Sequence, residues 1–170
     1  MPRNEQATES ARPSRRLALL GGTVVLAGVG AFASGWFNIF ASANTAGALS
    51  VAEAFAQAEA GHIYLIDIRR PDEWGRTGVA SPAIAMDMRR DDFEAVLQAI
   101  IDQSGDRPVA LICARGVRSD RMNARLRAAG FGNIIDVPEG VLGSGAGPGY
   151  IAAGLPLRAP TAAELAGQIP

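Results

Sequence analysis

The chain of 170 residues has no lysine, a single histidine and a single cysteine. One cysteine excludes a disulfide within the chain and a zinc site built from several cysteines. One histidine, His62, leaves little basis for a histidine metal site or for a nucleophile activated by histidine. We therefore expect no metal and no cofactor, and any catalysis must use other groups.

An excess of charge of either sign is also missing. The 16 basic residues, all of them arginine, nearly balance 17 acidic residues and leave a net charge of −1. Without a basic excess, we expect no nucleic-acid partner. Arginine alone supplies the cations, and its guanidinium binds oxyanions through two parallel hydrogen bonds. Hydrophobic residues make up 48% of the chain, which is enough for the core of one domain.

Charged residues are absent between Arg16 and Glu53. Ser14, Arg15 and Arg16 stand directly before an apolar run, Leu17–Phe40, and this pattern of a basic start followed by an apolar stretch is typical of a targeting segment. The paired arginines resemble a twin-arginine export signal. We expect residues 1–43 to be a signal peptide or a membrane anchor.

Two fates of this segment remain open. Ala41–Ala43 has the small-residue pattern of a cleavage site, which would release a chain beginning at Asn44, and Ala31–Ala33 is a second candidate. Alternatively, residues 17–40 stay as a transmembrane helix, because about 20 apolar residues suffice to cross a bilayer. In both cases the arginines near the start stay inside. The domain is then expected in the periplasm, exported or tethered to the inner membrane.

Helical and strand patterns alternate along the rest of the chain. Ser50 and Glu53 form a capping-box pattern that opens a helix, and Gly61 closes it. Further helices are expected from Asp91 or Asp92 onwards and over 119–129. The expected strands are 63–68, 83–88, 108–112 and 134–137. This alternation predicts an α/β fold with a parallel central sheet and helices on both faces. The apolar N-terminal segment would add a helix before it.

Cys113 lies at the end of the strand expected over 108–112, which is where open α/β sheets bind ligands. The loop after it leads into a helix, whose N-terminal N–H groups and positive potential favour a thiolate. Gly116 allows a tight backbone path. Arg115 and Arg118 are candidates for orienting an anionic substrate. The sequence therefore predicts a nucleophilic cysteine in an anion-binding loop formed by Ala114, Arg115, Gly116, Val117, Arg118 and Ser119.

The pattern Cys-Ala-Arg-Gly-Val-Arg-Ser over 113–119 resembles the active-site loop of the rhodanese family. Two further stretches resemble that family in order and spacing. The first is Leu65–Arg69 with Glu73 and Trp74, and the second is Gly130–Ile134 with Glu139, Gly140 and 153–156. The resemblance implies a single rhodanese-like domain over 44–158. We expect the remaining residues, 159–170, to be a flexible tail.

The resemblance also implies an activity. A rhodanese-type thiosulfate sulfurtransferase would take sulfane sulfur from a small anionic donor onto Cys113 as a persulfide. It would then pass the sulfur to a thiol or cyanide. The loop amides would hold the persulfide, and Asp67 and Arg69 would support the loop as an ion pair.

Two other functions are compatible with the same residues. The domain could be a non-enzymatic persulfide carrier that docks on a periplasmic partner, with the glycine-rich segment 138–149 as the docking region. It could also be a phosphatase or arsenate reductase. The six-residue loop from Cys113 to Arg118 and the lack of a second cysteine argue against that third function, since the related phosphatases use seven residues. The glycine-rich segment is either a flexible loop or part of the substrate rim.

Overall fold

The computed structural model of the chain describes residues 47–105 and 107–168. The expected signal or anchor, 1–43, lies outside the described residues. Within the described part, no helix is long and apolar enough to cross a membrane.

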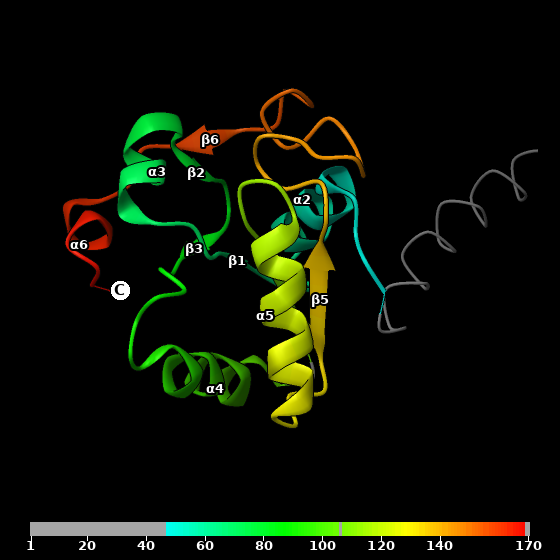
Figure 1. Cartoon of the computed structure of the whole chain (residues 1–170), viewed down its shortest axis with the longest axis vertical. Helices are drawn as coiled ribbons and strands as arrows, with labels where there is room; N and C mark the ends of the chain where they lie inside the picture. The colour runs from blue at the N-terminus through cyan, green and yellow to red at the C-terminus, as the bar shows by residue number, and fades with distance from the viewer. Residues whose placement is uncertain (1–46, 106, 169–170) are drawn as a thin grey trace, which may run out of the picture. The chain divides into compact units, whose positions relative to one another are not determined.

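A four-stranded sheet forms the centre of the domain (Figure 1). Its strands are β1 (Tyr64–Asp67), β3 (Ile84–Ala85), β4 (Val109–Ile112) and β5 (Ile134–Val137). They lie in the order β3-β1-β4-β5, and every neighbouring pair is parallel. The α/β fold with a parallel central sheet is therefore confirmed. The strand expected over 83–88 is much shorter, because only Ile84 and Ala85 pair with β1.

Helices cover both faces of the sheet, as the buried, continuously apolar strands require. One face packs against α2 (Val51–Glu59) and α3 (Pro71–Thr77) through a core that includes Leu65, Trp74 and Ile112. The other face packs against α4 (Phe93–Ser104) and α5 (Val117–Ala128) through a core that includes Ile66, Leu111 and Leu126. Alternate residues of β1 and β4 thus belong to opposite cores.

The helix boundaries follow local signals with two differences. The capping box is confirmed, because the Ser50 hydroxyl accepts from the Glu53 N–H and the Glu53 carboxylate accepts from the Ser50 N–H. Asp92 stands at the N-cap of α4, but its side chain makes no capping hydrogen bond. Helix α5 begins at Val117, two residues before the expected start at 119, because Gly116, with φ of 79°, turns the chain directly into the helix.

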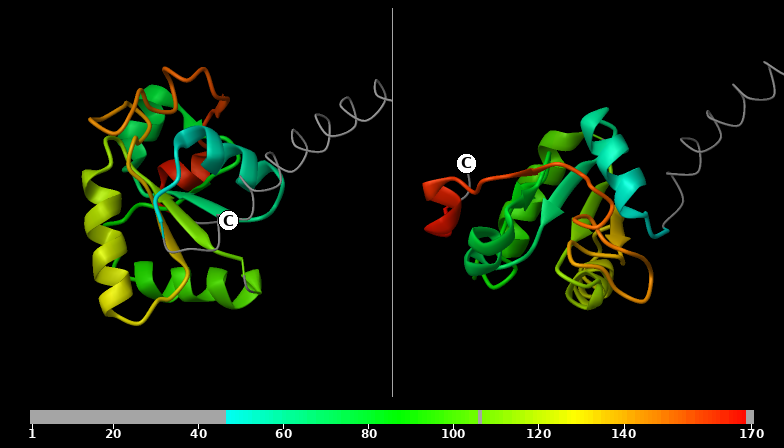
Figure 2. Two further views of the ribbon diagram at one scale, coloured as in Figure 1. Left: turned by 90° about the vertical axis from the view of Figure 1, so that its right-hand side faces the viewer. Right: turned by 90° about the horizontal axis from the view of Figure 1, so that it is seen from above.

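The C-terminal segment differs from the flexible tail expected over 159–170. Strand β6 (Leu157–Arg158) pairs antiparallel with β2 (Val79–Ala80), and α6 (Ala162–Leu165) follows beside α3 (Figures 1 and 2). Glu164 is 3% exposed and accepts from Arg158 Nη2 at 2.6 Å and Nη1 at 2.9 Å. This ion pair and a capping box between Thr161 and Glu164 hold the segment in place. The alanine- and proline-rich composition of the segment does not predict these contacts.

The carboxyl ends of three adjacent strands meet at one edge of the sheet. Asp67 ends β1, Cys113 follows β4 and Pro138 follows β5. In register, Asp67 pairs with Ile112, and Ile112 pairs with Val137. The sheet therefore brings together the cysteine loop (residues 113–118), the end of β1 at Asp67 and the glycine-rich segment (residues 138–149).

Candidate active site

Cys113 is 1% exposed and lies between the end of β4 and the start of α5. The Ser119 hydroxyl is placed to donate to Cys113 Sγ at 3.5 Å or to the Gly116 carbonyl at 2.9 Å. Ser119 is itself fully buried. Because one hydroxyl has one proton, the two acceptors share it, and a charged sulfur would attract it more strongly than a neutral one.

The loop from Cys113 to Arg118 runs directly into α5, a helix of 12 residues. The first N–H groups of a helix have no partner within it, and its dipole places positive potential at the same point. Gly116 is the N-cap residue of α5, and its carbonyl accepts the Asp120 N–H at 3.0 Å. The amides around Val117 and Arg118 therefore lie at the electropositive start of a helix that follows the sulfur.

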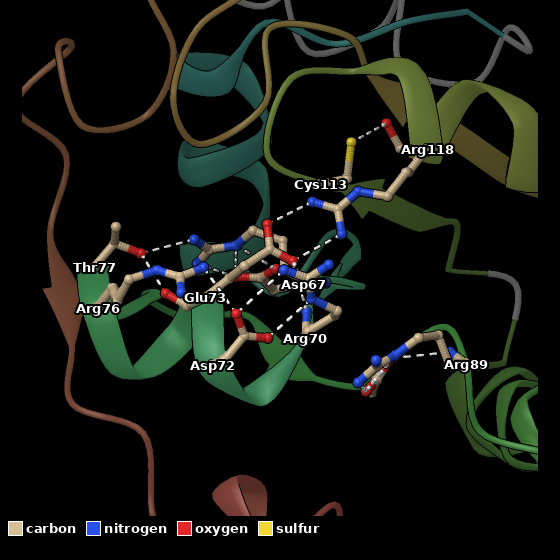
Figure 3. A network of polar contacts seen from close by, with 12 residues as sticks. Asp67, Arg70, Asp72, Glu73, Arg76, Thr77, Arg89, Cys113 and Arg118 are labelled. Atoms are coloured by element: carbon tan, nitrogen blue, oxygen red, sulfur yellow. Dashed lines mark hydrogen bonds and ion pairs between the residues drawn. The ribbon is translucent and has the colours of Figure 1, made fainter.

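Arg118 is tied to α3 rather than free for a substrate. Its Nη1 and Nη2 atoms donate to Glu73 Oε2 at 2.8 Å and to Oε1 at 2.6 Å (Figure 3). The hydrogen bonds and the charge of Glu73 raise the pKa of the Arg118 guanidinium, although burial opposes this effect. The charge of Arg118 is thus already paired with a carboxylate. The expectation that Arg118 orients a substrate anion stays a prediction, and this pairing does not favour it.

The Glu73 carboxylate lies within ion-pair distance of two arginines, with Arg118 Nη2 at 2.6 Å and Arg70 Nε at 3.5 Å. Burial opposes its ionisation, but hydrogen bonds from Arg118 and from the Arg70 N–H, at 3.1 Å, outweigh burial and lower the pKa of Glu73. Its position in the first turn of α3 also favours a negative charge. In the sequence, Glu73 is one of the residues that carry the resemblance to the rhodanese family. No local signal indicates that its partner is Arg118, which is 45 residues away.

Asp67 and Arg69 form a buried ion pair, with exposures of 0% and 1%. Arg69 Nη2 is 2.7 Å from Asp67 Oδ2 and also donates to the Gly78 carbonyl at 2.7 Å. Its Nη1 donates to Thr77 Oγ1 at 2.7 Å. The pair that the family resemblance implied is present, and it fixes the C-terminal end of α3. Since α3 also carries Glu73, the pair supports the cysteine loop indirectly.

Arg115 is the exposed cation of the loop. Its Nη1 donates to the Gly143 carbonyl at 3.3 Å, and among the described residues no carboxylate pairs with it. The charge of Arg115 is therefore more available to an incoming anion than that of Arg118. Gly143 connects this arginine to the glycine-rich segment.

The glycine-rich segment lies against the cysteine loop by backbone hydrogen bonds. The Val141 N–H donates to the Cys113 carbonyl and the Leu142 N–H donates to the Ala114 carbonyl, both at 2.8 Å. A β-carbon on Gly140 would lie 2.6 Å from the Ala114 carbonyl oxygen, and one on Gly116 would lie 2.1 Å from that of Pro138. Of the two expectations for 138–149, a rim beside the cysteine fits these contacts better than a flexible loop.

Glu139 has a role that the sequence did not indicate. It is buried, and its Oε1 accepts the Val51 N–H at 3.1 Å while its Oε2 accepts the Gly149 N–H at 3.2 Å. The carboxylate thus joins the N-terminus of α2 to the end of the glycine-rich segment. In the sequence, Glu139 stands out only as a glutamate followed by Gly140. That pattern does not predict which N–H groups its carboxylate binds. Among the described residues, no three His, Cys, Asp or Glu side chains are grouped to hold a metal ion.

The chain is similar to several solved structures, including the following three. Rv0390 from M. tuberculosis has a TM-score of 0.52 and 25% identity, covering 68% of this chain and 98% of that chain. A protein of unknown function from Rhodopseudomonas palustris, a possible tyrosine phosphatase, has a TM-score of 0.49 and 22% identity, covering 71% and 91%. The polysulfide-sulfur transferase homodimer of Wolinella succinogenes has a TM-score of 0.49 and 25% identity, covering 79% and 94%.

No curated protein matches the chain. The family model of the rhodanese-like domain matches residues 50–143, which is more than half of the chain. The matched stretch runs from the capping box of α2 to the glycine-rich segment and includes β1, β4, the cysteine loop and β5. The chain belongs to the rhodanese-like domain family.

Proposed function

We propose that the chain is a sulfurtransferase that moves sulfane sulfur from a small anionic donor, such as thiosulfate, to a thiophilic acceptor through a persulfide on Cys113. The observation that carries this proposal is a single cysteine in the loop between β4 and α5, with Ser119 placed to donate to its sulfur at 3.5 Å. Membership of the rhodanese-like domain family supports it. Neither the transfer of sulfur to Cys113 nor its transfer to the acceptor needs a metal, a cofactor or a second cysteine in the chain.

In the first step, the Cys113 thiolate attacks the outer sulfur of thiosulfate. A bond forms between the two sulfurs, the sulfur–sulfur bond of thiosulfate breaks, and sulfite leaves with that electron pair. Arg115 attracts the dianion, because its charge is not paired with a carboxylate of the described residues. The N–H groups at the start of α5 stabilise the terminal sulfur of the persulfide, which carries the negative charge.

In the second step, cyanide or a thiolate attacks the terminal sulfur and leaves with it, and the bonding pair returns to Cys113. The Ser119 hydroxyl then stabilises the restored thiolate. The surroundings of Cys113 favour small reactants, because the residue is 1% exposed. The added sulfur extends the nucleophile by about 2 Å, the length of one sulfur–sulfur bond, and so brings the reactive atom closer to the surface.

A persulfide carrier that docks on a partner protein is the second candidate. Three exposed apolar residues favour it, because they lie on segments around the cysteine loop. Val117 begins α5, Leu142 donates its N–H to Ala114, and Ile151 donates its N–H to Val141. Their exposures are 55%, 42% and 41%. A carrier would retain its sulfur in the presence of small acceptors and release it only to a protein.

Steady-state assays of the full-length chain distinguish these functions. A sulfurtransferase forms thiocyanate from thiosulfate and cyanide with many turnovers, and Cys113→Ser abolishes the activity. A carrier takes up one sulfur per chain and shows negligible turnover. If the chain hydrolyses an aryl phosphate in a reaction that depends on Cys113 and transfers no sulfur, both proposals are wrong and the chain is a phosphatase.

We also propose that residues 1–43 direct the domain to the periplasm, either as a cleaved signal or as an anchor. The paired Arg15 and Arg16 before a long uncharged run support this proposal. Expression of the full-length chain in a bacterium and fractionation of the cells would test it. Export that is lost in a variant with both arginines changed to lysine supports the proposal, and an unchanged cytoplasmic distribution of both proteins contradicts it.

A further inference from the structure

A hollow in the surface of the described domain lies beside α5. It is a cavity of about 300 Å³ between α5 and the edge strand β5. Four lining residues come from one face of α5, since their spacing follows the helical repeat. The lining is Gly47, Ala48, Asp120, Asn123, Ala124, Arg127 and Asp136. No residue of 113–119 is among them.

Asp136 is the buried acid of this cavity. Along β5, Ile134 packs into the core beneath α5, so Asp136, two residues further on, points to the same side. Asp136 is 8% exposed, and its Oδ1 atom has no hydrogen-bond partner within 47–105 and 107–168. Burial raises the pKa of this carboxyl and the nearby charge of Asp120 adds to that effect, whereas the Ser119 hydroxyl and the Val137 N–H oppose it; neither group makes a hydrogen bond with Oδ1. A buried acceptor without a donor is costly, which favours a site that a donor completes.

The charges around Asp136 do not neutralise it. Asp120 forms no ion pair in the described part of the chain. Arg127 uses Nε to hold Asn123 Oδ1 and Nη2 to hold the Ile134 carbonyl, each at 3.0 Å. Two carboxylates and one guanidinium leave one negative charge in the cavity. Its chemistry is therefore that of a cation site.

We propose that this cavity binds a small organic cation through a primary ammonium group, with Asp136 and Asp120 as the acceptors. An ammonium group carries three N–H donors, which matches an orphaned carboxylate oxygen beside a second carboxylate. A bare metal ion fits less well. Calcium takes about six to eight oxygen ligands, and the amide oxygen of Asn123 is already held by Arg127. The cavity volume also leaves room for a carbon chain.

Calorimetric titration of the full-length chain with butylammonium tests this proposal. We expect saturable binding of one equivalent and a loss of affinity of about tenfold or more in Asp136→Asn, which keeps the shape but removes the charge that accepts the hydrogen bonds. Asp120→Asn gives a smaller loss. Asp91→Asn, an exposed acid outside the cavity, is the matched control and binds as the unchanged chain does.

Three further arms make the test specific. Tetramethylammonium has the same charge but no N–H donors, so it should bind at least about tenfold more weakly than butylammonium. Equal binding of both cations, unchanged affinity in a folded Asp136→Asn protein, or no binding of butylammonium overturns the proposal. Displacement of butylammonium by stoichiometric calcium overturns it in favour of a metal. Cys113→Ser should bind with unchanged affinity, so a failure of the sulfur chemistry leaves this result independent.

Discussion

Arg118, the last residue of the cysteine loop, and Glu73, in the first turn of α3, are joined by two hydrogen bonds of 2.8 and 2.6 Å. The pair connects two segments that follow different strands, β1 and β4. On the other side, α3 is held by the buried pair of Asp67 and Arg69. The position of the loop that carries Cys113 therefore depends on charges that never touch the sulfur.

The first prediction concerns this connection. Glu73→Gln removes the carboxylate but keeps the side-chain size, and it leaves the Arg118 guanidinium partly buried without its counter-charge. We expect the free energy of unfolding to fall by about 1–2 kcal/mol, the range for charge-assisted hydrogen bonds that are partly shielded from water. Urea denaturation measures it.

The matched control for Glu73 is Asp72→Asn. Asp72 is the neighbouring residue of α3 and pairs with Arg70 and Arg76, but its side chain is half exposed. We expect a clearly smaller loss of stability, because water screens exposed pairs. Equal losses in both variants would show that the pair between Glu73 and Arg118 contributes no more than a surface ion pair.

A second prediction concerns the Ser119 hydroxyl. Ser119→Ala removes the group placed to donate to Cys113 Sγ, so the thiolate is less stabilised. We expect the rate of Cys113 alkylation by iodoacetamide at neutral pH to fall by about three- to tenfold, which corresponds to one hydrogen bond of ordinary strength. Ser104→Ala, another buried serine that bonds to backbone carbonyls at the end of α4, should leave the rate unchanged. A rate unaffected by Ser119→Ala would remove Ser119 from the chemistry.

A third prediction tests the contact between the cysteine loop and the segment after β5. Gly116 has a positive φ, and a β-carbon there would lie 2.1 Å from the Pro138 carbonyl oxygen. Alanine at this position should strongly destabilise the fold and abolish sulfur transfer. Gly105→Ala separates the two causes, because Gly105 also has a positive φ but open space around it. Gly105 combines a φ of 63° with a ψ of −134°, which side chains other than glycine rarely adopt, so we expect about 1–3 kcal/mol of strain there and a considerably larger loss at Gly116.

Gly132→Ala completes that series. Gly132 has neither a positive φ nor a neighbour within 4 Å, so its replacement should be neutral or slightly stabilising. Thermal unfolding of the three variants ranks them. If Gly116→Ala is no worse than Gly105→Ala, the cysteine loop and the segment after β5 are not as closely packed as the distances indicate.

The fold as a whole follows from short-range patterns, and the sequence predicts it well. Each of these patterns spans fewer than ten adjacent residues. They are the capping box of α2, the buried strands β1, β4 and β5, and the glycine before α5. Cys113 at a strand end follows from the same patterns. These signals are local because helix capping and side-chain alternation act between near neighbours.

The missing parts of the site depend on partners far apart in the chain. Glu73 and Arg118 are 45 residues apart, and Glu139 reaches Val51 across 88 residues. A single sequence shows each charge but not which other charge it meets. The antiparallel pair of β2 and β6 was missed for a related reason, because strands of two residues are too short to show alternation.

A fourth prediction concerns the C-terminal segment and its pH dependence. Hydrogen bonds from Arg158 lower the pKa of Glu164 to about 2. In the unfolded chain the pKa of this carboxyl is near its ordinary value of 4.5, so the stabilisation is fully present above about pH 4.5 and is lost as the pH falls towards 2. Glu164→Gln should cost about 1–2 kcal/mol at neutral pH, allowing for the partly exposed arginine.

Urea titrations between pH 7 and pH 2.5 check this prediction. The difference between the unchanged chain and Glu164→Gln should shrink steadily below about pH 4. A difference that is constant across this range would mean that the carboxylate of Glu164 does not stabilise the fold through its charge, and that the segment from β6 to α6 is held by other contacts.

The proposal that Cys113 carries sulfur is tested most directly by the intact mass of the full-length chain after treatment with thiosulfate and removal of excess donor. We predict that the mass rises by one sulfur atom and that cyanide returns it to the starting value with release of thiocyanate. Cys113→Ser should gain nothing under the same conditions. An unchanged mass in the native chain, or an equal gain in the serine variant, would contradict the proposal.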